Sequence, residues 1–299
     1  MPRFFGNLHC HSTNSDGDSP PAEVARFYRE RGFSFVGITD HNHRTGPEDC
    51  SDTGRDFAVL GACEYSASCD GHPLHINGIG ATATHGPAET PASAVAVLQH
   101  GIDGFLAQGA FTILNHPNWE WGFGRTELLA VHGAHAMELW NGAMDSDNLG
   151  DAQHESTESL WDAALTAGRR LWAVASDDCH HFGPKRTFRS DPPFSGWVAV
   201  ECERPESQLI LNALHAGRFY ASNGPRFDRL VLTPRAIEVA AKPAGRRCRI
   251  VFIGSGGRVL GMVEGHEARY VPVGDEGYVR VRVESGMGQC AWSQPLFLT

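Results

Sequence analysis

Short apolar runs alternate with helical patterns over much of the chain. Seven runs rich in apolar and β-branched residues have the character of buried strands, and most of the gaps between them carry helical apolar spacing. Strands that alternate with helices form βαβ units with parallel neighbours. The sequence therefore predicts an α/β domain on a largely parallel sheet. The expected strands are residues 3–9, 33–39, 57–64, 74–80, 110–116, 136–141 and 170–177.

Four segments carry the start and stop signals of helices. Residues 19–32 open with a capping Ser19 and two prolines, and they close on Gly32. Within residues 90–109 the apolar spacing is helical, but Gly101 and Gly104 are candidates for a break. The other two expected helices cover residues 156–168 and 204–217, and each ends on a glycine.

The pattern changes near Gly224 and Pro225. The following segments alternate apolar and polar residues between turns that contain glycine or proline, and none has helical spacing. Such alternation is typical of antiparallel strands with one buried face. We therefore expect two domains, an α/β domain over residues 1–224 and a small antiparallel β module over residues 225–299.

Charge and cysteine usage restrict the expected partners and location. The net charge of −10 argues against nucleic acid or an anionic membrane as a partner and leaves a small-molecule substrate. No apolar run approaches transmembrane length, and no secretory leader opens the chain. The eight cysteines form no C-x-x-C pair, so a cytoplasmic protein with reduced thiols is expected. The sequence carries no signal for the oligomeric state.

Nearly every predicted strand has a histidine or a carboxylate at or near its C-terminal end. In a parallel barrel these ends meet on one face. Neutral imidazoles and carboxylates together suit zinc, manganese or iron, and one tetrahedral zinc takes only about four ligands. The inventory therefore predicts a cluster of two or three divalent ions. The strand-end residues are His9, His11, Asp40, His41, Glu64, His75, His116, Glu138, Asn141, Asp177, Asp178, His180 and His181.

Taken singly, these residues have simpler explanations. A strand-end histidine such as His75 is more often a hydrogen-bonded structural residue than a ligand. Asp40 alone is more typical of a helix cap or a loop anchor. The joint pattern favours metal binding, because burying so many carboxylates without cations would be prohibitive.

Several motifs also resemble those of a known family in order and spacing. "LHCHSTNSDG", "GITDHN", "CEYS", "HINGIG", "NHPN" and "SDDCH" are similar to motifs of the polymerase-and-histidinol-phosphatase (PHP) family of metal-dependent phosphoesterases, over most of residues 1–224. The later stretches "GWVAVE", "ALHAGRFYASNGP" and "AWSQPLFL" resemble its carbaryl-hydrolase-like branch of metallohydrolases. The resemblance implies a distorted (β/α)7 TIM-like barrel that holds two or three divalent ions.

The resemblance also implies which residues bind each ion. Glu64 would bridge the first two ions, and Asp16 would hold the third. Some family members have histidine in place of Asp16, which implies a third site that is weaker or differently selective. Asp177, one residue before the motif aspartate Asp178, is the second choice for that ligand. The three implied sets are His9, His11, Glu64 and Asp178; Glu64, His75 and His116; and Asp16, His41 and His180.

The function predicted from these residues is metal-dependent hydrolysis of a small-molecule phosphate ester by a metal-bridging hydroxide. The candidates for proton transfer are Asp178, Asp40 and His181, and Asp40 is alternatively placed to orient His41. The same metal site also suits a carbamate, ester or amide hydrolase, in which the ions polarise a carbonyl. A non-catalytic module with a degenerate site is a third class, which the near-complete ligand set disfavours.

Cations and aromatic residues in the loops are the candidates for substrate binding. Lys185 and Arg186 follow the seventh strand and are expected to bind phosphate, although a solvated loop explains them almost as well. Arg125 and His43 are further candidates for substrate contacts. Aromatic residues after the fifth strand suggest an apolar pocket wall. They are Trp119, Trp121 and Phe123.

Overall fold

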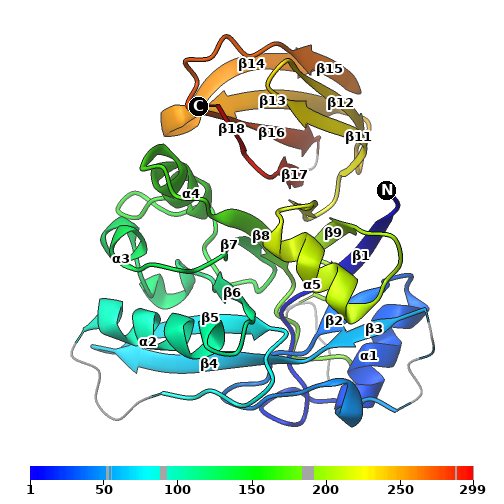
Figure 1. Cartoon of the computed structure of the whole chain (residues 1–299), viewed down its shortest axis with the longest axis vertical. Coiled ribbons are helices and arrows are strands. Elements are labelled where there is room, and N and C mark those ends of the chain that lie inside the picture. The colour runs from blue at the N-terminus through cyan, green and yellow to red at the C-terminus, as the bar shows by residue number, and fades with distance from the viewer. Residues whose placement is uncertain (52–53, 55, 88–92, 184–191, 287, 299) are drawn as a thin grey trace.

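Three β-sheets organise the chain, with ten, five and three strands (Figure 1). The computed structural model describes residues 1–51, 54, 56–87, 93–183, 192–286 and 288–298. The ten-stranded sheet has the order β14-β13-β16-β17-β10-β9-β1-β2-β3, with β18 paired to β16, and the five-stranded sheet has the order β4-β5-β6-β7-β8. No helix in the described part of the chain is long and apolar enough to cross a membrane.

The four predicted helices and most of the predicted strands of the first part are confirmed, with small shifts at their ends. The predicted strand over residues 57–64 instead divides at Gly61 into two strands of different sheets, and the strands over residues 197–201 and 219–222 were not predicted. The strands are β1 (Arg3–Asn7), β2 (Phe35–Gly37), β3 (Ala58–Leu60), β4 (Ala62–Cys69), β5 (His72–Ile79), β6 (Phe111–Leu114), β7 (Ala136–Asn141), β8 (Trp172–Ser176), β9 (Trp197–Glu201) and β10 (Phe219–Ser222). The helices are α1 (Pro21–Glu30), α2 (Ala94–Leu106), α3 (Arg125–Ala130), α4 (Thr157–Thr166) and α5 (Ser207–His215). Single 3-10 turns occur at η1 (Pro47–Asp49) and η2 (Trp119–Trp121).

Helix α2 continues through Gly101 and Gly104, so the possible break there does not occur. A Cβ atom on Gly101 would lie 2.7 Å from the side chains of both Ile76 and Tyr65. The glycine therefore serves the close approach of α2 to β4 and β5 rather than a kink. The short helix α3 was not expected, since six residues carry too little periodicity to be recognised.

The prediction of a largely parallel sheet was only partly correct. Strands β1, β2 and β3 pair in parallel, as do β6, β7 and β8, but β4, β5 and β6 pair antiparallel. The cause is a tight turn between β4 and β5, in which Asp70 and Gly71 have positive φ angles of 52° and 87°. An Asp-Gly pair in this conformation joins two antiparallel strands directly.

The predicted (β/α)7 barrel is not found as a closed barrel among the described strands. Both edges of β1 are occupied, by β2 and by the antiparallel β9, so β8 has no free edge of β1 to join. Isolated bridges link the two sheets, from Cys10 to Cys179, from His41 to Glu64 and from Thr45 to Ala62. These bridges nevertheless draw the ends of β1, β2, β4 and β8 together.

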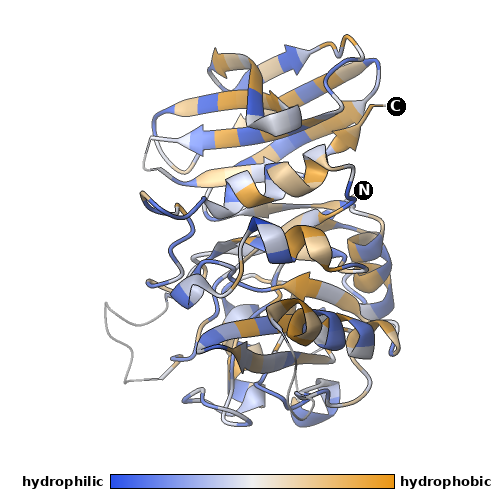
Figure 2. Ribbon diagram, turned by 90° about the vertical axis from the view of Figure 1, so that its left-hand side faces the viewer, coloured by the Kyte–Doolittle hydropathy of each residue, from blue (hydrophilic) through white to orange (hydrophobic). Residues whose placement is uncertain are grey.

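The C-terminal part is antiparallel, as predicted. Its strands alternate hydrophilic and hydrophobic residues along their length (Figure 2). Ile237, Val239, Ile250, Phe252 and Val281 share one buried core between its sheets. Strand β17 pairs with β10, so the ten-stranded sheet runs through both parts of the chain, and the boundary at residue 224 stays a prediction. The elements are β11 (Arg226–Thr233), β12 (Ala236–Lys242), β13 (Cys248–Gly254), η3 (Ser255–Gly257), β14 (Arg258–Glu264), β15 (Glu267–Tyr270), β16 (Tyr278–Ser285), β17 (Cys290–Ser293) and β18 (Leu296–Phe297).

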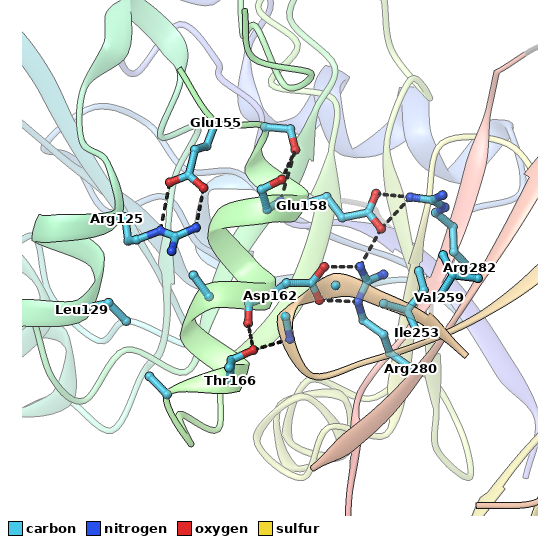
Figure 3. Close-up of a pocket in the computed structure, with 16 residues that line it drawn as sticks. Arg125, Leu129, Glu155, Glu158, Asp162, Thr166, Ile253, Val259, Arg280 and Arg282 are labelled. Carbon is cyan, nitrogen blue, oxygen red and sulfur yellow. Dashed lines mark hydrogen bonds and ion pairs between the residues drawn. The ribbon is translucent and has the colours of Figure 1, made fainter. Parts of the chain in front are cut away.

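A buried ion-pair network fastens β16 to α4 (Figure 3). Asp162 accepts hydrogen bonds from Arg280 and from the Tyr278 hydroxyl, and Glu158 accepts from Arg282. A cavity of about 630 Å³ lies beside this network. None of the predicted metal ligands lines it, so it is separate from the candidate site described next.

Candidate metal centre

All nine predicted metal ligands lie in one region, at or just beyond the ends of several strands. They form four overlapping groups, and in each group the possible ligand atoms lie within 4.8 Å of one another. The chain reaches this region from β1, β2, β4, β5, β6 and β8, which explains why the residues are so dispersed in sequence. The groups are His9, His11 and Glu64; His9, His116 and Asp178; His41, Glu64 and His75; and His11, Asp16, His41 and His180.

Glu64 is fully buried at the centre of this region. Its two carboxylate oxygens lie 2.6 Å from His41 Nδ1, 3.1 Å from His75 Nδ1 and 3.3 Å from His9 Nε2. Burial alone raises the pKa of a carboxyl group, but the surrounding histidines, led by His75 and His9, hold the pKa of Glu64 well below its usual range. The two oxygens face different histidines, which is the arrangement that a bridging carboxylate needs.

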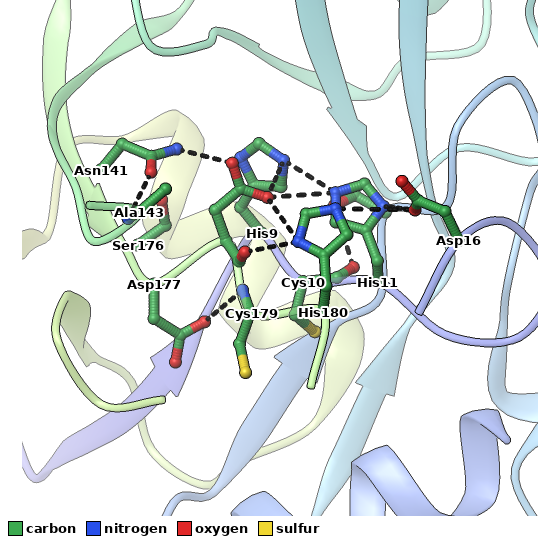
Figure 4. Close-up of polar contacts among 12 residues, drawn as sticks. His9, Cys10, His11, Asp16, Asn141, Ala143, Ser176, Asp177, Cys179 and His180 are labelled. Atoms are coloured by element: carbon green, nitrogen blue, oxygen red, sulfur yellow. Dashed lines mark hydrogen bonds and ion pairs between the residues drawn. The ribbon is translucent and has the colours of Figure 1, made fainter. Parts of the chain in front are cut away.

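Asp178 rather than Asp177 faces the histidines. Asp178 Oδ1 lies 3.1 Å from both His9 Nε2 and His11 Nε2. Burial opposes ionisation of Asp178, but these two histidines hold its pKa well below the usual range. Asp177 points the other way (Figure 4) and accepts hydrogen bonds from the Tyr28 hydroxyl, and burial raises the pKa of Asp177 to about 7. The first choice of aspartate therefore fits the geometry.

Asp16 is the most exposed of the nine residues, with 55% of its side chain accessible. Its carboxylate lies 3.4 Å from His41 Nε2, 3.5 Å from His180 Nε2 and 3.6 Å from His11 Nδ1. Burial raises the pKa of Asp16, but the hydrogen bond with His41 and the charge of His180 lower it further than burial raises it. The group around Asp16 is thus the solvent-facing part of the cluster.

The buried donor atoms fit bound metal ions. His75 Nδ1 and Asp178 Oδ1 are both buried and have no hydrogen-bond partner in the described part of the chain. His9 Nε2 and His11 Nε2 lie 3.3 Å apart and face the same two carboxylates. Polar groups in such a setting need a partner, and imidazole nitrogens with carboxylate oxygens suit divalent transition metals. These clusters therefore fit a multinuclear metal site.

A cavity of about 270 Å³ opens onto these groups. Besides predicted ligands, its wall contains Trp119, Asn141, Ala143, Asp145, Ser146 and His181. The Trp119 indole donates a hydrogen bond to Asp145, 3.2 Å away, and its ring lies 5.4 Å from the His75 ring. His181, a candidate for proton transfer, is thus at the cavity.

Other candidates lie elsewhere. Asp40 is fully buried and does not line the cavity. It accepts hydrogen bonds from Ser12 Oγ and Ser15 Oγ at 2.7 Å and from Thr45 Oγ1 at 2.6 Å. These contacts make Asp40 an anchor of the loop that carries Asp16. No contact in the described structure joins the Asp40 carboxylate to His41 or to the cavity, so neither the proposed proton transfer nor the orientation of His41 has support from this geometry.

Of the predicted substrate contacts, neither Arg125 nor His43 lines the metal cavity. Arg125 pairs with Glu155, at 2.9 Å from its Nε, and lines cavities beside α3 and α4 instead of the metal cavity. His43 is exposed and does not line the metal cavity either. Lys185 and Arg186 lie outside the described residues.

Sequence reasoning assigned no role to several residues that support the ligands. Glu138 contacts His9 Nδ1 at 2.8 Å, and Asn115 donates a hydrogen bond to Glu64 at 2.7 Å. Asn141 donates to both Glu138 and Asp178 at 3.0 Å. Glu138 and Asn141 were noticed at the end of a predicted strand. Position alone, however, does not distinguish a metal ligand from a residue that forms a hydrogen bond to a ligand.

Two of the comparisons with known proteins cover too little of the chain or match too loosely to show a fold. No family model matches the chain. A 5'-3' exoribonuclease of Haemophilus influenzae is 28% identical over 81 residues, which are 26% of this chain and only 30% of that protein. An amidohydrolase structure from Chromobacterium violaceum is 17% identical over 60% of this chain and 88% of its own, and its TM-score of 0.44 is too low to establish a common fold.

One solved structure covers nearly the whole chain. It is a two-domain protein from Bacteroides vulgatus that contains a predicted PHP-like metal-dependent phosphoesterase, with a TM-score of 0.53 and 14% identity. The match covers 99% of this chain and 95% of that one. The carbaryl-hydrolase-like branch stays a prediction. The resemblance to PHP-like metal-dependent phosphoesterases is thus confirmed for the fold of the chain as a whole.

Proposed function

We propose that the chain is a metal-dependent hydrolase that cleaves a phosphate ester of a small molecule. The observation that carries this proposal is the convergence of nine imidazole and carboxylate ligands around the buried Glu64, next to a cavity. The cavity volume of about 270 Å³ suits a small substrate, since pockets for drug-sized ligands start at about 300 Å³.

The residues would divide the work as follows. His9, His11, Glu64 and Asp178 would hold the first ion, His75 and His116 would complete the second, and Asp16, His41 and His180 would hold the third. Bound manganese, iron or zinc ions would supply an activated water and neutralise charge on the phosphoryl oxygens. His181 lines the cavity and is the described side chain best placed to give a proton to the leaving alcohol.

A second candidate, hydrolysis of a carbamate or carboxylic ester, has one observation in its favour. Among the described residues that line the cavity there is no lysine or arginine to pair with a phosphate. Trp119 and Ala143 instead offer apolar surface, which suits a neutral aryl ester. Lys185 and Arg186 stay proposed phosphate contacts in the leading reading.

Parallel steady-state assays separate the two candidates. Protein reconstituted with manganese or zinc is assayed with p-nitrophenyl phosphate, bis-p-nitrophenyl phosphate and an aryl N-methylcarbamate. We expect turnover of a phosphate ester, and loss of it in the His9→Ala, His11→Ala double variant with unchanged circular dichroism. Rapid carbamate cleavage with no phosphate turnover would overturn the leading proposal. Less than one ion per chain by elemental analysis would overturn both.

A further inference from the structure

Two buried carboxylates lie on opposite sides of the His9 ring. Glu64 faces Nε2 of His9 at 3.3 Å, on the side of the cavity. Glu138 faces Nδ1 at 2.8 Å, and it neither lines the cavity nor belongs to a ligand group. Glu138 is only 1% exposed, so its surroundings are entirely protein.

The two oxygens of Glu138 are surrounded by hydrogen-bond donors. Oε1 accepts from the Ser176 hydroxyl and contacts His9 Nδ1. Oε2 accepts from the backbone N–H of His116 at 2.8 Å and from Asn141 Nδ2 at 3.0 Å. A carboxylate with this set of partners acts as an acceptor only. When Nε2 of His9, which faces Glu64 and Asp178, binds a metal ion, the remaining ring proton would be held on Nδ1 by Glu138.

Asn141 extends the same arrangement to Asp178. The side-chain oxygen Oδ1 of Asn141 accepts a hydrogen bond from the backbone N–H of Ala143 at 2.9 Å, which fixes the orientation of the side-chain amide. Its NH2 group must therefore point at the carboxylates, and it donates to Asp178 Oδ2 at 3.0 Å. The other oxygen, Asp178 Oδ1, is left facing His9 and His11 with no hydrogen bond in the described structure.

We propose that Glu138, with Asn141, is a positioning residue that selects the coordinating atoms of the first metal site, Nε2 of His9 and Oδ1 of Asp178. The inference rests on the proposed metal-dependent function. Residues that orient metal-binding histidines in this way typically contribute 10–100-fold to metal affinity or activity. Glu138 also accepts a hydrogen bond from the backbone N–H of His116, a predicted ligand of the second ion. It therefore contacts ligand residues of both the first and the second ion.

The test is the Glu138→Gln variant, with manganese and zinc affinity measured by competition with a chelator. Glutamine has the same shape, but its NH2 group would take the place of an acceptor either of His9 Nδ1 or of the N–H groups of His116 and Asn141, so at least one of these donors would lose its acceptor. We expect the tightest site to bind about 10–100-fold more weakly. Asp162→Asn is the matched control, because Asp162 is also a buried carboxylate with several donors, and it lies at the α4–β16 network. Its metal affinity should equal that of the wild type.

Two further measurements keep the test decisive. Combined with His9→Ala, Glu138→Gln should weaken binding at the first site no further, because its effect on that site passes through His9. If Glu138→Gln does not fold, Asn141→Ala replaces it and should weaken the first site through Asp178. Equal affinity in Glu138→Gln and wild type, or an equal loss in Asp162→Asn, would overturn the assignment of Glu138. Failure of the wild type to bind any ion would instead overturn the proposed function.

Discussion

The guanidinium of Arg280 on β16 holds the carboxylate of Asp162 on α4 through two contacts, Nε to Oδ1 at 2.8 Å and Nη2 to Oδ2 at 2.6 Å. Arg280 is 1% exposed and Asp162 7%. Removal of one partner from a buried pair leaves the other charge without compensation. This pair therefore makes the contact between α4 and the C-terminal β-sheet sensitive to a single substitution.

Arg280→Met should lower the free energy of unfolding by about 3–5 kcal/mol. Chemical denaturation followed by fluorescence measures this change. The exposed pair of Arg249 and Glu264, at 3.0 Å, provides the control. Arg249→Ala should cost less than about 1 kcal/mol, as surface ion pairs do. Similar effects of both substitutions would show that the buried network contributes no special stability.

Asp16→Ala should remove one ion from the reconstituted protein without loss of the others. Asp16 is exposed and approaches the partly exposed His41 and His180 as well as the buried His11, whereas Glu64 and Asp178 are buried and contact His9. Elemental analysis after gel filtration gives the stoichiometry. An unchanged ion count would mean that Asp16 is not a ligand, and Asp18→Ala on the same loop serves as the control.

Metal removal should destabilise the folded protein. A ligand that binds only the native state at 100 times its Kd stabilises it by about 2.7 kcal/mol. The melting temperature should therefore fall after dialysis against a chelator and recover when manganese or zinc is added back. The His9→Ala, His11→Ala double variant should show a much smaller metal-dependent shift, while an equal shift would place the stabilising ions elsewhere.

The stability should fall between about pH 6.5 and pH 4 in part because of His135. Burial, and then the neighbouring His215, lower the pKa of His135 to about 4 in the folded protein. The unfolded chain, with a histidine pKa of about 6.5, takes up a proton first as the pH falls, so the stability present above pH 6.5 is lost towards pH 4. The effect is on the order of 1 kcal/mol after allowance for partial exposure.

His135→Asn tests this contribution, because its carbonyl can still accept the hydrogen bonds that Thr112 donates to His135 Nδ1. Denaturation curves at pH 7.5 and pH 4.5 should differ less for this variant than for the wild type. The exposed neighbour His132 gives the control variant His132→Asn, which should keep the wild-type difference. No reduction in His135→Asn would contradict the prediction.

The sequence by itself determined four helices and most of the strands of the first part, and it identified the residues gathered at the candidate site. Periodicity identified helix α1, which buries one face, and strand β8, which is buried along most of its length. Both patterns are local properties of the sequence. The histidines and carboxylates at strand ends were visible for the same reason, since a strand end is a local feature. The PHP-like fold followed from the order of these motifs.

Only the tertiary structure decided how those pieces meet. The β4–β5 hairpin, the occupied edges of β1 and the pairing of β17 with β10 depend on partners far apart in the chain, which local patterns do not encode. The motif already favoured Asp178, but the opposite direction of Asp177 and the hydrogen bond of Glu138 to His9 depend on side-chain direction and on the donors that surround each oxygen. Arg125, a predicted substrate contact, pairs with Glu155 and does not line the metal cavity, and this contact becomes visible only after folding.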